Sequence, residues 1–156
     1  MGVRVVEIRD PQSELIQEII ALEREAFGEP AALNEWTLPM LIANGKVFVL
    51  EVGGKAYGVA ALLRQWSDPL LSYLVTFSIA KDRRRRGLGR EFLGRILQRV
   101  REEGLLRVRL TVSPDNLPAH SLYERAGFQA VFFLRDYYGP GEDRLLMELR
   151  LDSDTK

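Results

Sequence analysis

The segment between residues 70 and 103 constrains the fold of this 156-residue chain more than any other part. It starts as a run rich in β-branched and aromatic residues, passes through a basic turn that holds two glycines, and continues with apolar residues at helical spacing. These apolar residues are Leu88, Phe92, Leu93, Ile96, Leu97 and Val100, and Gly104 ends the pattern. A strand, a turn and a long amphipathic helix in this order predict a domain in which helices pack on a sheet.

The rest of the chain extends this mixed pattern. Gly53-Gly54 separates two apolar runs and is typical of a β-hairpin. We expect strands over 3–9, 46–52, 57–64, 70–80, 105–112, 128–137 and 144–151, and helices that begin near Ser13, Asn34, Gly87 and Asn116. The predicted order is β-α-α-β-β-β-α-β-α-β-β, an α/β (α+β) mixed sheet of about seven strands with helices on both faces. We expect one domain over 1–151 and a short tail over 152–156.

Composition excludes several classes of enzyme. Hydrophobic residues make up 46% of the chain and charged residues 28%, as in a globular protein. The absence of cysteine excludes disulfides, thiolate metal sites and a cysteine nucleophile, and the single histidine, His120, cannot build a multi-histidine metal site. No apolar run reaches the roughly 20 residues of a membrane span, and the charged, alternating start differs from a signal peptide. We therefore expect a cytoplasmic protein without a metal.

The basic turn is the most informative local feature. Nine Lys and Arg residues lie between Lys81 and Arg101, against two acidic residues, in a chain whose formal net charge is zero. Glycines at 87 and 89 let the backbone approach a ligand closely, and the free amides and dipole of the following helix favour an anion. The alternative interpretation is a solvated arginine run before an ordinary turn. The spacing fits neither a Walker loop nor a dinucleotide-binding fingerprint.

The segment Arg84-Arg85-Arg86-Gly87-Leu88-Gly89 resembles the Gln/Arg-x-x-Gly-x-Gly/Ala motif of the GNAT N-acetyltransferase superfamily. The resemblance implies acetyl-CoA as co-substrate, with its pyrophosphate held by the turn and the start of the helix. The residues so assigned are Arg84, Arg85, Arg86, Gly87, Leu88, Gly89 and Arg90. It also implies that Phe77, Ser78 and Ile79, on the preceding strand, pair with the pantetheine arm and polarise the thioester carbonyl.

A second segment, from Asn116 to Phe128, resembles the pattern Asn-x-x-Ala-x-x-Leu-Tyr-x-x-x-Gly-Phe of the same family. The resemblance implies that Asn116 contacts the cofactor arm and that Tyr123 lies beside its sulfur. The seven-residue spacing is about two helical turns, so the two side chains share a face. Each residue also has a structural interpretation, since Asn116 fits a helix N-cap and Tyr123 fits a buried core tyrosine.

The acceptor side resembles the protein N-alpha-acetyltransferase branch, including its bacterial RimI-like type. Arg135-Asp136-Tyr137-Tyr138 is similar to the arginine and paired tyrosines that line the acceptor groove in that branch, which makes Tyr137 and Tyr138 substrate-binding candidates. Thr111 stands where RimI-type enzymes carry a glutamate base, and threonine cannot take a proton at neutral pH. Tyr73 is similar to a catalytic tyrosine of some members and could position a water, or it is a strand tyrosine packed in the sheet. Glu35, a further substrate-binding candidate, or another carboxylate would be the final proton acceptor.

These features predict direct transfer of an acetyl group to an amine in a ternary complex, with Tyr123 donating a proton to the leaving sulfur. An α-amine of pKa about 7.7–8.0 is roughly a tenth neutral at pH 7, whereas a lysine is neutral in roughly one molecule in two thousand, so a site with a poor base favours an N-terminus. Two alternatives stay open, a small-amine acetyltransferase and a non-catalytic acyl-CoA sensor. An RNA-binding domain is disfavoured, because the basic cluster is confined to one strand–helix junction and lacks interleaved aromatic residues. We expect no nucleic-acid or membrane partner and a monomer or homodimer.

Overall fold

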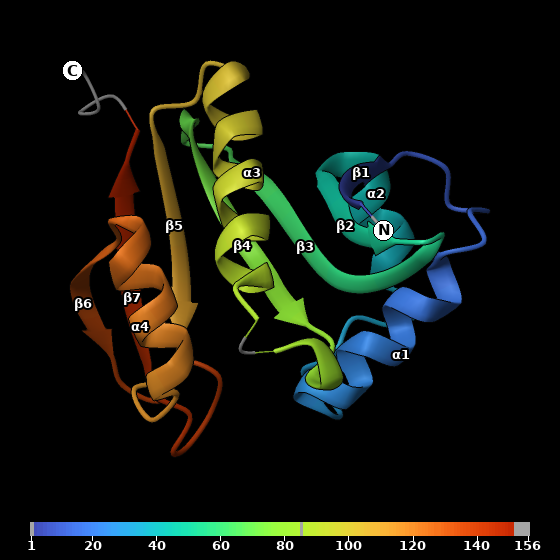
Figure 1. Ribbon diagram of the computed structural model, residues 1–156. Helices are drawn as coiled ribbons and strands as arrows, with labels where there is room; N and C mark the ends of the chain where they lie inside the picture. Colours follow the sequence, from blue (N-terminus) through green and yellow to red (C-terminus); the bar gives the residue numbers. More distant parts are fainter. Residues whose placement is uncertain (1, 85, 152–156) are drawn as a thin grey trace. The chain divides into compact units, whose positions relative to one another are not determined.

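The computed structural model describes residues 2–84 and 86–151, and its elements follow the predicted order (Figure 1). The expected tail over 152–156 lies outside the described residues. The strands are β1 (Val3–Ile8), β2 (Lys46–Val52), β3 (Lys55–Gln65), β4 (Asp68–Ile79), β5 (Arg107–Val112), β6 (Gln129–Leu134) and β7 (Arg144–Arg150). The helices are α1 (Ile16–Phe27), α2 (Leu38–Asn44), α3 (Leu88–Glu102) and α4 (Leu117–Ala126), with a 3₁₀ turn, η1, over Lys81–Arg83.

The strands form one seven-stranded sheet in the order β1-β2-β3-β4-β5-β7-β6. β4 and β5 are parallel, whereas β5 pairs with β7 and β7 pairs with β6 in antiparallel register. Two compact units divide the chain: unit 1 holds residues 1–63 and 74–97, and unit 2 holds residues 64–73 and the chain from 98 onward. Strands β3 and β4 contribute residues to both units, and the mixed α/β fold predicted from the sequence is confirmed.

In unit 1, α1 and α2 pack on one face of the first strands of the sheet. The apolar residues of α1 recur at helical spacing, and every second residue in the buried middle of β2 and of β3 faces the same core. That core contains Ile8, Ile19, Ile20, Leu33, Leu38, Leu41, Ile42, Val47, Val49, Val59 and Ala61. Between the two strands, Gly53 and Gly54 have φ angles of 60° and 84°, which is the geometry that the predicted two-residue hairpin requires.

Helices cover both faces of β4 within unit 1. The Phe77 ring stacks on Phe92 of α3 with centroids 5.3 Å apart, while the Thr76 hydroxyl donates to Glu23 of α1 over 2.7 Å. Successive strand residues point to opposite faces, so α3 and α1 lie on opposite sides of this strand. One prediction was wrong in detail: α2 begins at Leu38 and not at Asn34, because the Asn34 side chain accepts from the amides of Trp36 and Thr37 in a turn before the helix.

In unit 2, α4 is bounded by the residues that the sequence indicated. Asn116 caps the helix by accepting from the Ala119 amide over 3.3 Å, and Pro118 lies in the first turn. Gly127 ends it with φ +108°, and a Cβ at Gly127 would stand 2.9 Å from the Leu149 side chain. The conformation therefore requires glycine, whereas the end of the Leu149 side chain could move aside. None of the helices within residues 2–84 and 86–151 combines the length and the apolar character of a membrane span.

Candidate active site

The basic turn is fastened to the ends of the strands of unit 1. The Ala80 amide donates to the Tyr57 carbonyl over 2.8 Å, and the Arg84 Nε donates to the Ile79 carbonyl over 2.9 Å. The Arg83 guanidinium lies over the Tyr57 ring at 4.2 Å from its centroid. Arg83 and Arg84 thus hold the turn in place. These two arginines have a structural role in the turn, so their presence does not require a ligand.

The turn then opens into the start of α3. Gly87 has φ +78°, and a Cβ added there would meet nothing within 4 Å, so conformation and not crowding requires glycine. The first hydrogen bond of the helix runs from the Glu91 amide to the Gly87 carbonyl. By helix geometry, the amides of Leu88, Gly89 and Arg90 before it point along the axis, where the dipole is positive. Arg86 and Arg90 are exposed around them, whereas Arg85 lies outside the described residues.

The preceding strand places its three predicted residues at the end of β4. Phe77 is partly buried and packs on α3, whereas Ser78 and Ile79 are buried. The buried Ser78 hydroxyl forms no hydrogen bond of ordinary length in the described part of the chain, although it lies near enough to the Glu23 carboxyl to lower the pKa of that group. Gly58 of β3 comes so close that a Cβ there would stand 3.1 Å from the Ser78 carbonyl oxygen. Within unit 1, the basic turn and the end of β4 therefore lie next to each other and form one continuous part of the candidate site.

Tyr123 lies on α4 in unit 2. It is 7% exposed, and its ring meets Phe128 edge-on with centroids 5.7 Å apart. Burial raises the pKa of the Tyr123 hydroxyl above its ordinary value of 10.0, so the group is protonated at neutral pH. Asn116, two turns earlier, acts as the helix cap, as its structural interpretation predicted.

Unit 2 also brings together four residues singled out on the acceptor side. The Tyr73 hydroxyl lies 2.9 Å from Thr111 Oγ1. Burial raises the pKa of Tyr73, the Thr111 hydrogen bond opposes this, and hydrogen bonding to Tyr138 together with the nearby Tyr137 raises it further. The rings of Tyr137 and Tyr138 meet edge-on at 4.8 Å. We call Tyr73, Thr111, Tyr137 and Tyr138 the tyrosine cluster; its hydroxyls can donate or accept hydrogen bonds.

A pair of aspartates that the sequence reasoning missed holds the paired tyrosines. The Asp136 amide donates to the Asp143 carboxylate, and the Asp136 carboxylate accepts from the Gly141 amide, each over 2.8 Å. Asp136 has a φ of 51°, a conformation that aspartate adopts more readily than most residues. The Arg144 guanidinium lies 5.0 Å from the Tyr138 ring centroid. The Gly-Pro-Gly stretch between the aspartates was the signal for this closed turn.

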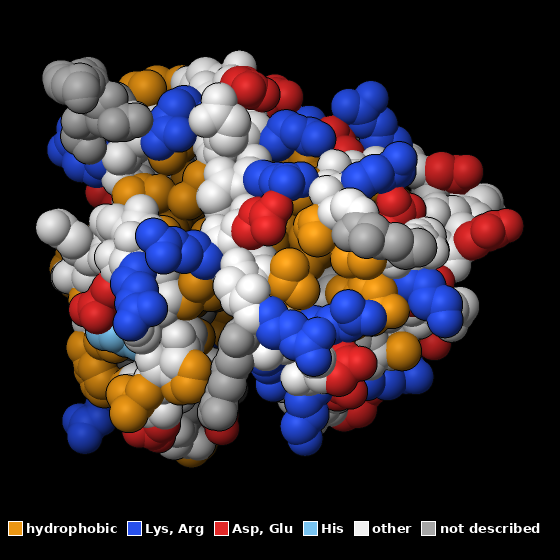
Figure 2. Space-filling view, in the orientation of Figure 1, with side chains coloured by type: hydrophobic (Ala, Val, Ile, Leu, Met, Phe, Trp, Pro, Cys, Tyr) orange, Lys and Arg blue, Asp and Glu red, His pale blue; other side chains and the backbone are white. Residues whose placement is uncertain are grey.

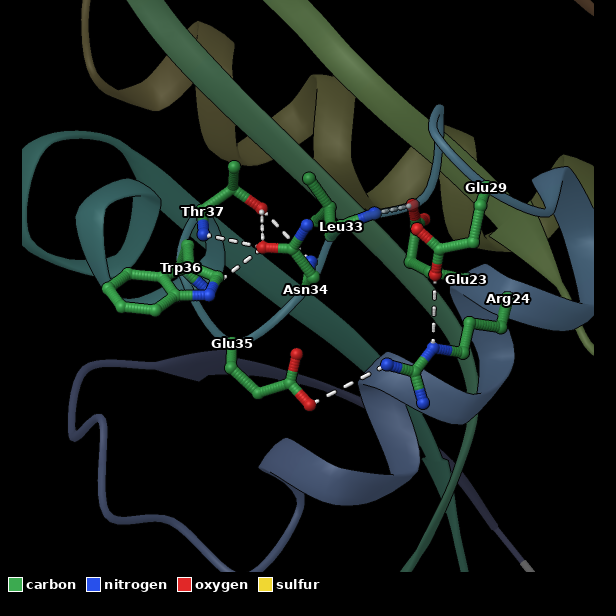
Figure 3. Close-up of polar contacts among 8 residues, drawn as sticks. All are labelled: Glu23, Arg24, Glu29, Leu33, Asn34, Glu35, Trp36 and Thr37. Carbon is green, nitrogen blue, oxygen red and sulfur yellow. Dashed lines mark hydrogen bonds and ion pairs between the residues drawn. The ribbon is translucent and has the colours of Figure 1, made fainter.

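Glu35 lies in unit 1, on the segment between α1 and α2 (Figure 3). Its carboxylate pairs with Arg24 at 3.6 Å, and the same guanidinium pairs with Glu29 at 3.4 Å. All three side chains are more than half exposed, so these pairs contribute little stability. The structure therefore gives Glu35 an arginine neighbour that the sequence reasoning did not foresee.

Among the described residues, the remaining charged side chains form no metal site. His120 forms an i, i+4 contact of 3.5 Å with Glu124 on α4. No group of three or more His, Asp or Glu able to hold a metal occurs within residues 2–84 and 86–151. On the face drawn in Figure 2, Lys and Arg side chains are interspersed with Asp and Glu, in keeping with the net charge of zero.

Comparison with known proteins identifies relatives over most of the chain. Residues 11–128 match the model of the acetyltransferase (GNAT) family. The chain is 29% identical over 150 residues to the N-alpha-acetyltransferase of Sulfurisphaera tokodaii, covering 90% of each protein. It is 33% identical over 79 residues to the ribosomal protein bS18-alanine N-acetyltransferase of Salmonella typhimurium, covering 49% of this chain and 53% of that one. The structure of a Bacillus subtilis acetyltransferase in complex with CoA superposes with a TM-score of 0.78 at 15% identity, over 96% of this chain and 99% of that one, which supports the fold.

Proposed function

Because this chain belongs to the acetyltransferase (GNAT) family and is an acetyl-CoA-dependent N-acetyltransferase, we propose that its acceptor is the α-amine of a peptide or protein N-terminus. The tyrosine cluster is the observation that carries this proposal. Its members supply hydroxyl groups and no strong base, and a site with a poor base favours an amine of low pKa such as an N-terminus. The relative from Sulfurisphaera tokodaii, matched over 90% of each chain, supports it. Residues 1–151 are proposed to act as one domain, in line with the family match over 11–128.

The donor is proposed to bind at the basic turn. The amides at the start of α3 would donate hydrogen bonds to the pyrophosphate oxygens of acetyl-CoA, because they are directed outward and carry the positive end of the helix dipole. The open space above Gly87 fits close approach of a ligand to the backbone. Arg84, Arg86 and Arg90 add positive charge, and Asn116 is proposed to contact the pantetheine arm beyond its capping role.

In the proposed reaction, the neutral amine attacks the thioester carbonyl, the C–N bond forms and the C–S bond breaks. Backbone groups near Phe77, Ser78 and Ile79 would stabilise the oxyanion, a contribution of about 10²–10³-fold per donor in known sites. The Tyr123 hydroxyl would donate a hydrogen bond to the departing sulfur. Since a thiol has a pKa of about 8.5 and that of Tyr123 is raised above 10.0, the hydroxyl stabilises a thiolate and does not surrender its proton completely.

The amine must lose a proton before or during attack. Thr111 cannot accept it, and Tyr73 stays neutral because its pKa is raised. We propose that these two hydroxyls orient the amine or a water, that Glu35 contributes to binding of the acceptor amine, and that bulk water or a carboxylate such as Glu35 receives the proton. An α-amine, about a tenth neutral at pH 7, suits such a site better than a lysine.

A matched pair of peptides tests the acceptor. One peptide has a free α-amine and acetylated lysines, and the other has an acetylated N-terminus and free lysines. Release of CoA thiol with the first and not with the second is the expected result. The double variant Tyr137→Ala/Tyr138→Ala should lose turnover of the first peptide by about 10²-fold or more, the scale of a lost positioning contact. Equal loss with a polyamine, or no loss with the peptide, would favour a small-amine enzyme instead.

A further inference from the structure

A buried carboxyl group joins three separate elements of unit 1. Glu23 of α1 has no exposed surface. One of its oxygens accepts from the Leu33 amide over 3.0 Å, and the other accepts from the Thr76 hydroxyl over 2.7 Å (Figure 3 draws the first contact). The group therefore connects α1, the segment over 28–37 and strand β4.

A cation usually accompanies a buried carboxylate such as that of Glu23. No ion pair within residues 2–84 and 86–151 involves it, and the adjacent Arg24 pairs with Glu29 and Glu35 instead. Burial raises the pKa of Glu23, against the Leu33 amide and the Thr76 and Ser78 hydroxyls, which lower it. Burying a polar group costs folding free energy unless the group is hydrogen-bonded. The hydrogen bonds from Leu33 and Thr76 offset this cost for Glu23.

The Leu33 contact attaches an ordered turn to the core. Leu33 is 7% exposed, and directly after it the Asn34 side chain accepts from the Trp36 and Thr37 amides. The Asn34 amide in turn donates to the Thr37 hydroxyl over 3.0 Å. Residues 34–37 thus form a closed unit that carries Glu35, and the Leu33 amide ties its beginning to Glu23.

The second contact reaches the strand that precedes the basic turn. Thr76 is only partly buried and is followed directly by Phe77, Ser78 and Ile79, the strand end proposed to meet the thioester. We propose that Glu23 is a positioning residue that fixes the 28–37 segment against β4 and thereby sets the KM of the acceptor amine. This role rests on the proposed function, in which Glu35 contributes to acceptor binding.

Three variants test this role. Glu23→Gln keeps the shape and both contacts, since its carbonyl can accept from the Leu33 amide and its amide can donate to the Thr76 hydroxyl. Glu23→Ala removes both contacts, and Thr76→Val removes one. Glu14→Gln is the matched control, because Glu14 is exposed just before α1. The acceptor KM should rise about tenfold in Glu23→Ala and stay within about twofold in Glu23→Gln and the control, with kcat and the Kd of CoA little changed. If Glu23→Ala does not fold, Thr76→Val and Glu23→Gln decide.

A second measurement needs no acceptor. Amide hydrogen exchange over 28–37 should accelerate in Glu23→Ala and Thr76→Val and remain as in the wild type in Glu23→Gln. Unchanged exchange in the first two variants would overturn the positioning role, whatever the acceptor is. A Glu23→Gln enzyme that loses kcat with an altered pH profile would also overturn it, because Glu23 would then take a proton. Failure of every peptide to react, with exchange changed as expected, would refute only the proposed acceptor.

Discussion

Removing one oxygen from Tyr123 tests the proposed role of this residue most directly. Tyr123→Phe keeps the buried ring and its edge-on contact with Phe128 at 5.7 Å, so the change is confined to the hydroxyl. Because burial raises the pKa of Tyr123, the hydroxyl should act by donating a hydrogen bond to the developing thiolate. A hydrogen bond to a charged group contributes about 1.5–3 kcal/mol, which corresponds to a fall in kcat of roughly 10- to 150-fold.

The assay is thiol release at saturating acetyl-CoA and peptide, with the Kd of acetyl-CoA measured by calorimetry in the absence of an acceptor. The Kd should change by less than about threefold, because the hydrogen bond is formed to the leaving group and not to bound thioester. Protonated Tyr123 is the active form, and its pKa lies above 10.0, so kcat of the wild type should show no loss from this group as pH rises to 10.

Urea unfolding provides the control for this variant. The free energy of unfolding should fall by no more than about 1.5 kcal/mol, the net contribution of an ordinary hydrogen bond. If Tyr123→Phe retains more than half of the wild-type kcat while remaining folded, Tyr123 does not assist the leaving group, and the assignment based on its place in α4 is wrong.

Three further perturbations follow from the structure. Gly87→Ala places alanine at a φ of +78°, a conformation that costs it about 1–2 kcal/mol. Calorimetry should therefore show CoA bound roughly tenfold more weakly, and unchanged binding would contradict the proposed CoA site. Phe92→Ala removes a fully buried ring stacked on Phe77 and should lower the free energy of unfolding in urea by about 3–5 kcal/mol. The pKa of Glu23 is raised in the folded state, so the native protein binds this proton more tightly than the unfolded chain. The wild type should therefore lose stability as the pH rises above 4.5, the ordinary pKa of a glutamate. Glu23→Gln should gain stability relative to the wild type over this range, measured by urea unfolding at several pH values.

Local features of the chain were sufficient to predict the order of the elements. The hairpin at Gly53-Gly54, the basic turn before α3 and the bounds of α4 each depend on residues within a few positions of one another. Asn116 caps α4 because its own side chain reaches the Ala119 amide, and Gly127 ends the helix because few other residues adopt its conformation. The prediction that α2 begins at Asn34 was wrong, because an asparagine that forms a turn before a helix and an asparagine that caps a helix give the same sequence signal.

The tertiary structure alone decided which side chains meet. Tyr73 and Thr111 are 38 positions apart and come together because β4 and β5 pair in parallel, with Tyr73 opposite Arg109. Glu23 reads in the sequence as a polar residue on an amphipathic helix, yet its partners are 10 and 53 positions away and it is fully buried. Short-range patterns record backbone conformation, whereas register and burial depend on how the whole chain packs. The sequence therefore determined the turn and the helix that follows it, and the fold determined the tyrosine cluster and the buried carboxyl.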